Sequence, residues 1–184
     1  MSNTRAVRTL RLYGNHLADA AAFYFGEMLS ENATITHLDL SWNLIKAPGA
    51  KGLAQGLRTN HVLQTLSLAW NGLETQGGVY IGEMLAGNDG LTDLDLSNAR
   101  IGPEAAMVLS EGIKQNITLL TLRLDANPIG HDGGRHLMDA LNVNDVLTSL
   151  GLQGVSFFRS AAGLAAFNPA NPDGHYMLTL DNTD

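Results

Sequence analysis

The sequence has no cysteine, few aromatic residues and no long hydrophobic run. Without cysteine the chain has no disulfide framework, and a cysteine-based metal site or nucleophile is excluded. No apolar stretch approaches the roughly 18 residues that predict a membrane-spanning helix. Aromatic residues make up 6% of the 184 residues, so a core must be built mainly from aliphatic side chains.

Positive charge is also scarce, since 11 Lys and Arg residues face 18 Asp and Glu residues, for a net charge of -7. Sequence-independent binding of nucleic acid needs clustered basic residues that neutralise phosphates, so we expect no nucleic-acid partner. The first residues, Met1 to Arg5, do not open a signal peptide. We therefore expect a cytoplasmic protein that does not associate with membranes.

What the chain does have is a repeat of constant length. The pattern apolar-x-x-Leu-x-Leu recurs every 28 residues, starting at Val7, Ile35, Leu63, Leu91, Leu119 and Leu147. Alternation of Leu with polar residues is typical of a strand with one buried face. Leu178 and Leu180 continue the same phase and predict a seventh strand over residues 175–181.

Two further columns follow each predicted strand at the same period. The first contains Asn15, Asn43, Asn71, Ala99, Asn127 and Val155. An inward-turned Asn can satisfy backbone groups of the turn, so we expect looser turns in repeats four and six, which lack it. The second contains only small residues and predicts the start of a closely packed helix: Ala21, Gly49, Gly77, Ala105, Gly133 and Ala161.

The predicted helices carry apolar residues four positions apart, which form one buried stripe. They are Phe25 and Leu29, Leu53 and Leu57, Ile81 and Leu85, Leu109 and Ile113, and Leu137 and Leu141. A column of asparagines then follows, at Asn32, Asn60, Asn88, Asn116 and Asn144. Because Asn tolerates the left-handed conformation that commonly ends a helix, we expect these residues to act as helix caps.

Strings such as Ile35-Thr-His-Leu-Asp-Leu-Ser-Trp-Asn43 and Leu119-Leu-Thr-Leu-Arg-Leu-Asp-Ala-Asn127 resemble the ribonuclease-inhibitor type of leucine-rich repeat. The resemblance implies an α/β solenoid, a right-handed β–α superhelix shaped like a horseshoe. We expect one domain over residues 1–184. The family includes inhibitors, immune sensors, GTPase activators and cytoskeletal or ciliary adaptors, so the resemblance leaves the function open.

Parallel strands lie about 4.8 Å apart and packed helices about 8–10 Å apart, so the array should bend with the sheet on its concave side. Polar strand positions would then face the hollow. The candidate partner-binding residues on this face are Arg11, Tyr13, His37, Asp39, Trp42, Trp70, Asp93, Asp95 and Arg123.

Trp42 and Trp70 are 28 residues apart and should stand side by side, with Tyr13 nearby, as a binding hot spot. The alternative is that they fold over the sheet edge and cover the turns. The aspartates would receive a basic segment of a partner. Their alternative role is a self-paired, solvated polar face.

The pattern predicts no catalytic residue, cofactor or metal site. Asp93 and Asp95 would sit on an open sheet, and the six histidines fall in different columns. The leading hypothesis is therefore a scaffold that binds a partner protein through the concave face. A second is a structural subunit of a large cytoskeletal or ciliary assembly, and a third is a regulator of another enzyme, as an inhibitor or a GTPase activator.

Nothing resembling a polar end cap precedes Val7, and Pro169 and Pro172 interrupt the sixth predicted helix. We therefore expect either a fragment of a longer protein or a subunit whose ends contact other subunits. An arbitrary boundary of the chain is the alternative explanation.

Overall fold

The computed structural model describes residues 7–155, in which strands and helices alternate along the chain. The elements are β1 (Thr9–Arg11), α1 (Asp19–Glu31), β2 (His37–Asp39), α2 (Ala47–Leu57), β3 (Thr65–Ser67), α3 (Glu74–Leu85), β4 (Asp93–Asp95), α4 (Pro103–Gln115), β5 (Thr121–Arg123), α5 (Gly130–Leu141) and β6 (Ser149–Gly151). All strand pairs are parallel, and the spatial order of the strands is their order in the sequence. The predicted seventh strand and sixth helix lie outside the described residues.

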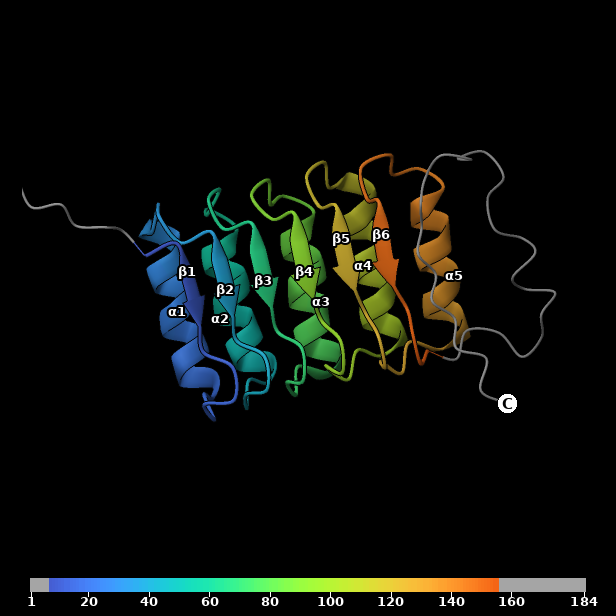
Figure 1. The fold of residues 1–184 in the computed structure, drawn as a ribbon. Helices are drawn as coiled ribbons and strands as arrows, with labels where there is room; N and C mark the ends of the chain where they lie inside the picture. Colours follow the sequence, from blue (N-terminus) through green and yellow to red (C-terminus); the bar gives the residue numbers. More distant parts are fainter. Residues whose placement is uncertain (1–6, 156–184) are drawn as a thin grey trace, which may run out of the picture.

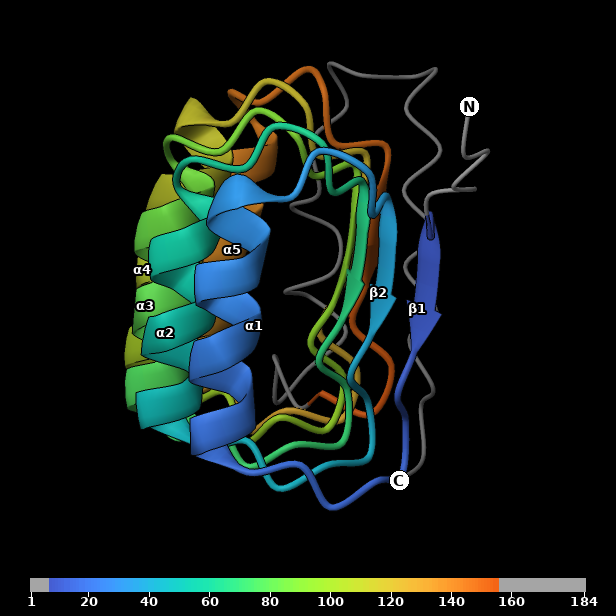
Figure 2. The same ribbon diagram turned by 90° about the vertical axis from the view of Figure 1, so that its left-hand side faces the viewer.

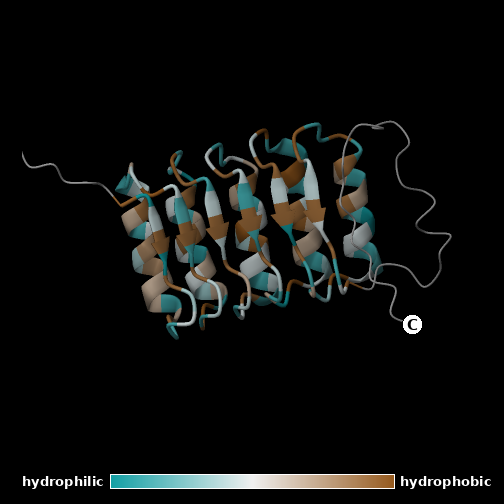
Figure 3. Cartoon of the chain, viewed as in Figure 1, coloured by the Kyte–Doolittle hydropathy of each residue, from teal (hydrophilic) through white to brown (hydrophobic). Residues whose placement is uncertain are grey.

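The solenoid has two layers, which Figure 1 shows from the sheet side and Figure 2 from one end. All the described helices cover one face of the sheet, and the opposite face is open. Each strand residue pairs with the residue 28 positions later, so that Leu38 lies between Leu10 and Leu66. Figure 3 shows the consequence, a hydrophobic residue at the same level in every strand. This confirms the α/β solenoid predicted from the repeat.

The core lies between the two layers and is almost entirely aliphatic. From the second repeat on, the second Leu of each strand pattern, such as Leu68 or Leu96, is fully buried, as is the helix stripe at Leu53 and Leu57. Helices α1 and α2 approach until their backbones are in contact, and so do α3 and α4. A Cβ atom on Gly56 would overlap the carbonyl oxygen of Gly26. No side chain larger than hydrogen fits there, so these glycines bring α1 and α2 close together.

Buried asparagines join each repeat to the one before it where helices lead into strands, which we call the amino edge. The Asn60 side-chain nitrogen donates to the carbonyl oxygens of Leu29 (2.7 Å) and Asn32 (3.0 Å) in the preceding repeat. Its oxygen accepts from the backbone nitrogen of Leu63 at 2.8 Å. The same pattern recurs at Asn88, Asn116 and Asn144.

This arrangement corrects the expected reason for the asparagine column. Asn32 and Asn116 follow their helices with φ of -79° and -76°, which is extended backbone and not left-handed. The asparagines do follow the helix ends, but they act through their side chains. An amide carries both a donor and an acceptor, so it satisfies the last helix carbonyls of one repeat and the strand-entry N–H groups of the next.

A second asparagine ladder lies at the opposite, carboxyl edge, where strands lead into helices. The Asn43 side-chain nitrogen donates to the carbonyl oxygens of Leu12 (2.9 Å) and Leu40 (3.0 Å). Its oxygen accepts from the backbone nitrogen of Leu17 at 2.8 Å. Asn71 and Asn127 repeat the arrangement. The expectation that these side chains satisfy the turns is confirmed.

The missing asparagines change the turn of the preceding repeat, and in repeat four Arg100, which follows Ala99, is also left-handed, with a φ of +61°. The residue at the helix entrance is extended at Lys46 and Gly102, which face Asn71 and Asn127 in the next repeat. The equivalent Glu74 and Gly130 precede Ala99 and Val155, and they have φ of +59° and +68°. Without an asparagine oxygen the backbone finds other acceptors, such as the Ala99 oxygen for the Glu74 nitrogen at 3.0 Å. The turn becomes left-handed.

The first prediction concerns the amino-edge ladder. Asn88→Ala should lower the free energy of unfolding by about 3 kcal/mol, because it leaves several buried backbone groups without partners. Urea denaturation followed by circular dichroism measures this. Asn142→Ala, at an exposed position after α5, should change stability by less than about 0.5 kcal/mol. Equal losses in the two variants would show that the ladder does not hold the repeats together.

The second prediction concerns the left-handed turn at Glu74. Glu74→Gly should raise the free energy of unfolding by about 0.5–1 kcal/mol, since the strain relieved exceeds the entropy that glycine loses on folding. The matched control is Glu104→Gly in the first turn of α4, which should be destabilising by a similar amount. Thermal or urea denaturation compares the two. Destabilisation by Glu74→Gly would contradict the strained turn.

Candidate partner-binding surface

The outward residues of the strands form the open face opposite the helices, here called the sheet face. It contains Thr9, Arg11, His37, Asp39, Thr65, Ser67, Asp93, Asp95, Thr121, Arg123, Ser149 and Gly151, all exposed or half-buried. Arg11 lies directly opposite Asp39, and Asp95 lies opposite Arg123. The His37 ring is within hydrogen-bond distance of the Thr36 hydroxyl at 2.8 Å. The sequence therefore placed these candidate residues on the correct face.

The carboxylates of this region are already engaged with neighbouring groups. Asp39 accepts from the Ser41 hydroxyl (2.6 Å) and backbone nitrogen (3.0 Å), and Asp95 accepts from the Ser97 backbone nitrogen (2.9 Å). Asp93 pairs across the sheet with Arg123 at 3.6 Å. Such exposed pairs add little stability. The face thus carries three aspartates and two arginines, with Asp39 and Asp95 held by their own turns and Asp93 by Arg123.

The two tryptophans lie at the carboxyl edge, in the loops that follow β2 and β3. Their rings stack with centroids 4.1 Å apart and planes 10° from parallel. The predicted neighbourhood of Trp42 and Trp70 is therefore correct, although neither comes from a strand. Both remain exposed, at 56% and 46%. Tyr13 is exposed in the loop after β1. It lies one position before the tryptophan column, at the position that Ser41 occupies in the next repeat.

The backbone at the tryptophans is left-handed. The column is Gly14, Trp42, Trp70, Asn98, Ala126 and Gly154, and its φ values lie between +52° and +69°. Its N–H groups extend the sheet hydrogen bonding, as from Trp42 to the Ala69 oxygen (2.9 Å) and from Trp70 to the Ser97 oxygen (2.8 Å). A left-handed residue with a side chain costs about 1–2 kcal/mol. The backbone at both tryptophans is therefore strained, and the rings that it carries are about half exposed.

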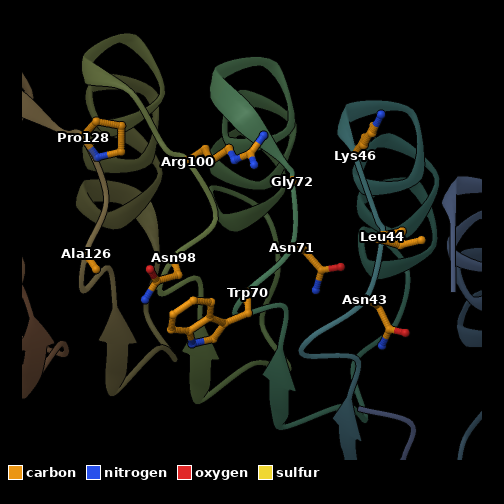
Figure 4. Close-up of a pocket in the computed structure, with 10 residues that line it drawn as sticks. All are labelled: Asn43, Leu44, Lys46, Trp70, Asn71, Gly72, Asn98, Arg100, Ala126 and Pro128. Carbon is orange, nitrogen blue, oxygen red and sulfur yellow. The ribbon is translucent and has the colours of Figure 1, made fainter. Parts of the chain in front are cut away.

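A groove with a volume of about 390 Å³ runs along the carboxyl edge beside Trp70. It is lined by Asn43, Leu44, Lys46, Trp70, Asn71, Gly72, Asn98, Arg100, Ala126 and Pro128, which Figure 4 shows arranged across four repeats. Within the described part of the chain, Lys46 and Arg100 are the charged residues that line it, and no carboxylate does. Arg100 reaches Glu74 at 3.7 Å, with both side chains well exposed. The charged residues that line the edge groove are thus basic, whereas the sheet face carries both aspartates and arginines.

Lys46 and Arg100 were not among the residues singled out from the sequence. The columns read for the surface ended at the tryptophan position, and both residues lie two to four positions beyond it. The 28-residue period does not group them, because Lys46 falls in the column of Glu74 and Gly102 whereas Arg100 falls in the column of Leu44 and Gly72. Their neighbourhood with Trp70 depends on the path of the loop, which the period does not give.

Outside these regions the described residues offer little chemistry. Within residues 7–155 no group of three His, Cys, Asp or Glu side chains could hold a metal ion. His61 bonds to Asp89 at the amino edge, and this hydrogen bond lowers the pKa of the Asp89 carboxyl. In that same part of the chain, no helix is long and apolar enough to cross a membrane.

Comparison with known proteins agrees with the repeat geometry. Residues 31–54, 59–82 and 90–110 match the family model described as Leucine Rich repeat. These stretches of the chain are leucine-rich repeats. Each contains one strand and part of the next helix.

Solved structures show the same leucine-rich-repeat fold. Leiomodin-1 actin-binding site 2 is 25% identical with a TM-score of 0.59, and the match covers 62% of this chain and 68% of that one. The tropomodulin C-terminal domain of Caenorhabditis elegans is 16% identical with a TM-score of 0.63, over 76% and 84% of the two chains. No curated protein matches the chain.

The third prediction concerns the tryptophan stack. Trp42→Gly should abolish the coupled indole signal in the near- and far-ultraviolet circular dichroism, because Trp70 then stands alone. The free energy of unfolding should change by less than about 1 kcal/mol, since relief of backbone strain offsets the lost ring contact. Tyr24→Ala, at an exposed aromatic residue of α1, is the control that leaves the signal unchanged. An unaltered spectrum in Trp42→Gly would show that the rings do not stack in solution.

Proposed function

We propose that the chain is a protein-interaction scaffold that binds a partner through the Trp42–Trp70 pair and the adjoining sheet face. The observation that supports it is an exposed aromatic stack on strained backbone. Stability alone does not favour tryptophan there, since glycine occupies the same column in two other repeats. Strained residues concentrate at functional sites, and exposed tryptophans are typical anchors of interfaces.

The remaining candidates fit this proposal as contributors to one surface. The surface continues toward the first repeat through Tyr13, Arg11, His37 and Asp39. It continues toward the fifth repeat through Asp93, Asp95 and Arg123. We propose no catalytic activity of its own for the chain. Its sheet-face carboxylates already accept hydrogen bonds from turns or pair with Arg123.

The candidate partner is actin, in a cytoplasmic setting. Support comes from the likeness to leiomodin-1 actin-binding site 2, at 25% identity over 68% of that domain. The same likeness favours a role in a cytoskeletal assembly, which was the second hypothesis from the sequence. In the first repeat, Leu10, Leu12, Leu17 and Phe25 are only partly buried, while their equivalents in the next repeat are fully buried. This end surface is compatible with contacts to another subunit.

The fourth prediction tests actin as the partner. The native chain should bind purified actin, as filaments in a pelleting assay or as monomers by fluorescence titration. The Trp42→Gly/Trp70→Gly variant should bind at least tenfold more weakly, because it removes both aromatic anchors while keeping the backbone conformation. Tyr24→Ala should bind like the native chain.

Two outcomes would contradict parts of the proposal. Absence of binding to both forms of actin would exclude actin as the partner, and affinity capture from cell extract with the same variants would then test the scaffold itself. Equal binding by the native chain and the double tryptophan variant would place the interface elsewhere on the molecule.

A further inference from the structure

The edge groove and the tryptophan stack form one continuous surface. The groove touches Trp70 but not Trp42, while Trp42 covers one face of the Trp70 ring. The next residues in the tryptophan column are Asn98 and Ala126, which are small and also line the groove. The stack therefore ends at Trp70, beside space in which no aromatic side chain of residues 7–155 continues it.

The dimensions of the groove fit an extended peptide. Its lining comes from the loops that follow β2, β3, β4 and β5, so it crosses three steps between neighbouring repeats. At about 4.8 Å per step, three steps span about 14 Å. An extended chain rises about 3.3 Å per residue, so four or five residues reach from one end to the other.

Charge and hydrogen bonding select the peptide's chemistry. Lys46 and Arg100 are exposed on the groove, and among residues 7–155 no carboxylate lines it, although the whole chain carries a net charge of -7. Glu74, which lies 3.7 Å from Arg100, is well exposed and outside the lining. The Asn98 amide makes no side-chain hydrogen bond within residues 7–155 and lies on the groove beside Trp70. A basic groove on an acidic protein favours an acidic ligand and disfavours basic ones.

We propose that the edge groove binds an extended acidic segment of a partner protein, with an aromatic side chain of that segment against the ring of Trp70. The proposal rests on the proposed scaffold function, since it specifies what part of a partner the tryptophan surface receives. The aromatic ring extends the stack beyond Trp70. Flanking carboxylates lie near Lys46 and Arg100, which are two repeats apart along the groove.

The fifth prediction uses the tryptophans themselves as the probe. The chain has two tryptophans, both in this surface, so its tryptophan fluorescence reports on the site alone. A blocked peptide of sequence Glu-Glu-Phe-Glu-Glu should change that fluorescence saturably. Glu-Glu-Ala-Glu-Glu and Lys-Lys-Phe-Lys-Lys should bind at least tenfold more weakly, because one lacks the ring and the other has the opposite charge. Equal affinity for the three peptides would overturn the proposal.

Variants at the groove provide the second measurement. Lys46→Gln/Arg100→Gln should weaken binding of the acidic peptide about tenfold, and raising the salt concentration should weaken binding to the native chain. The matched control is Arg58→Gln/Arg135→Gln, which removes the same charge from exposed positions after α2 and on α5. The control should stay within twofold of the native chain. Equal loss in both variants would show general charge attraction and overturn the groove assignment.

The same variants separate this proposal from the scaffold function. If a partner protein is lost by the double tryptophan variant but still bound by Lys46→Gln/Arg100→Gln, the acidic-segment proposal is wrong and the scaffold function stands. If both variants keep the partner, the tryptophan surface itself is not the interface. Loss of the partner in both variants, with the acidic peptide competing for the native chain, supports both proposals.

Discussion

The buried asparagine side chain is the interaction on which the rest of this structure depends. A single repeat has turns at both edges whose carbonyl and N–H groups would be left without partners when the next repeat stacks on it. An amide that donates to one repeat and accepts from another resolves this at each junction, as Asn88 does between the carbonyl of Leu57 and the nitrogen of Leu91. A buried polar group is costly unless satisfied, so repeats must stack in this register.

The same register places the candidate site. Residues of the tryptophan column adopt the same backbone conformation in neighbouring repeats, one strand spacing of about 4.8 Å apart. At the left-handed position this brings Trp42 and Trp70 into parallel contact, close to the separation at which aromatic rings stack. The stack is thus a consequence of repetition, and its strain is tolerated because the ladder hydrogen bonds hold the turn on both sides.

The repeat also sets the charge pattern of the surface. The strands carry Asp39, Asp93 and Asp95 together with Arg11 and Arg123, whereas loop positions at the carboxyl edge carry Lys46 and Arg100. The molecule thus presents a sheet face of mixed charge beside a basic groove, joined by the tryptophans. Such a surface orients a partner by its charge pattern and anchors it by an aromatic contact.

The sequence by itself determined the element order, the 28-residue pairing register, the identity of the core and the adjacency of the two tryptophans, because each follows from a constant period. It did not determine local backbone conformation. The asparagines after the helices looked suited to a left-handed cap, yet they are extended and act through their amides, while left-handed backbone occurs at Trp42, Trp70 and Glu74. Only the tertiary structure decided this, because φ at a turn depends on which groups the neighbouring repeat offers as hydrogen-bond partners. For the same reason the groove of Lys46 and Arg100 was invisible in the sequence: it exists only where loops of successive repeats lie side by side.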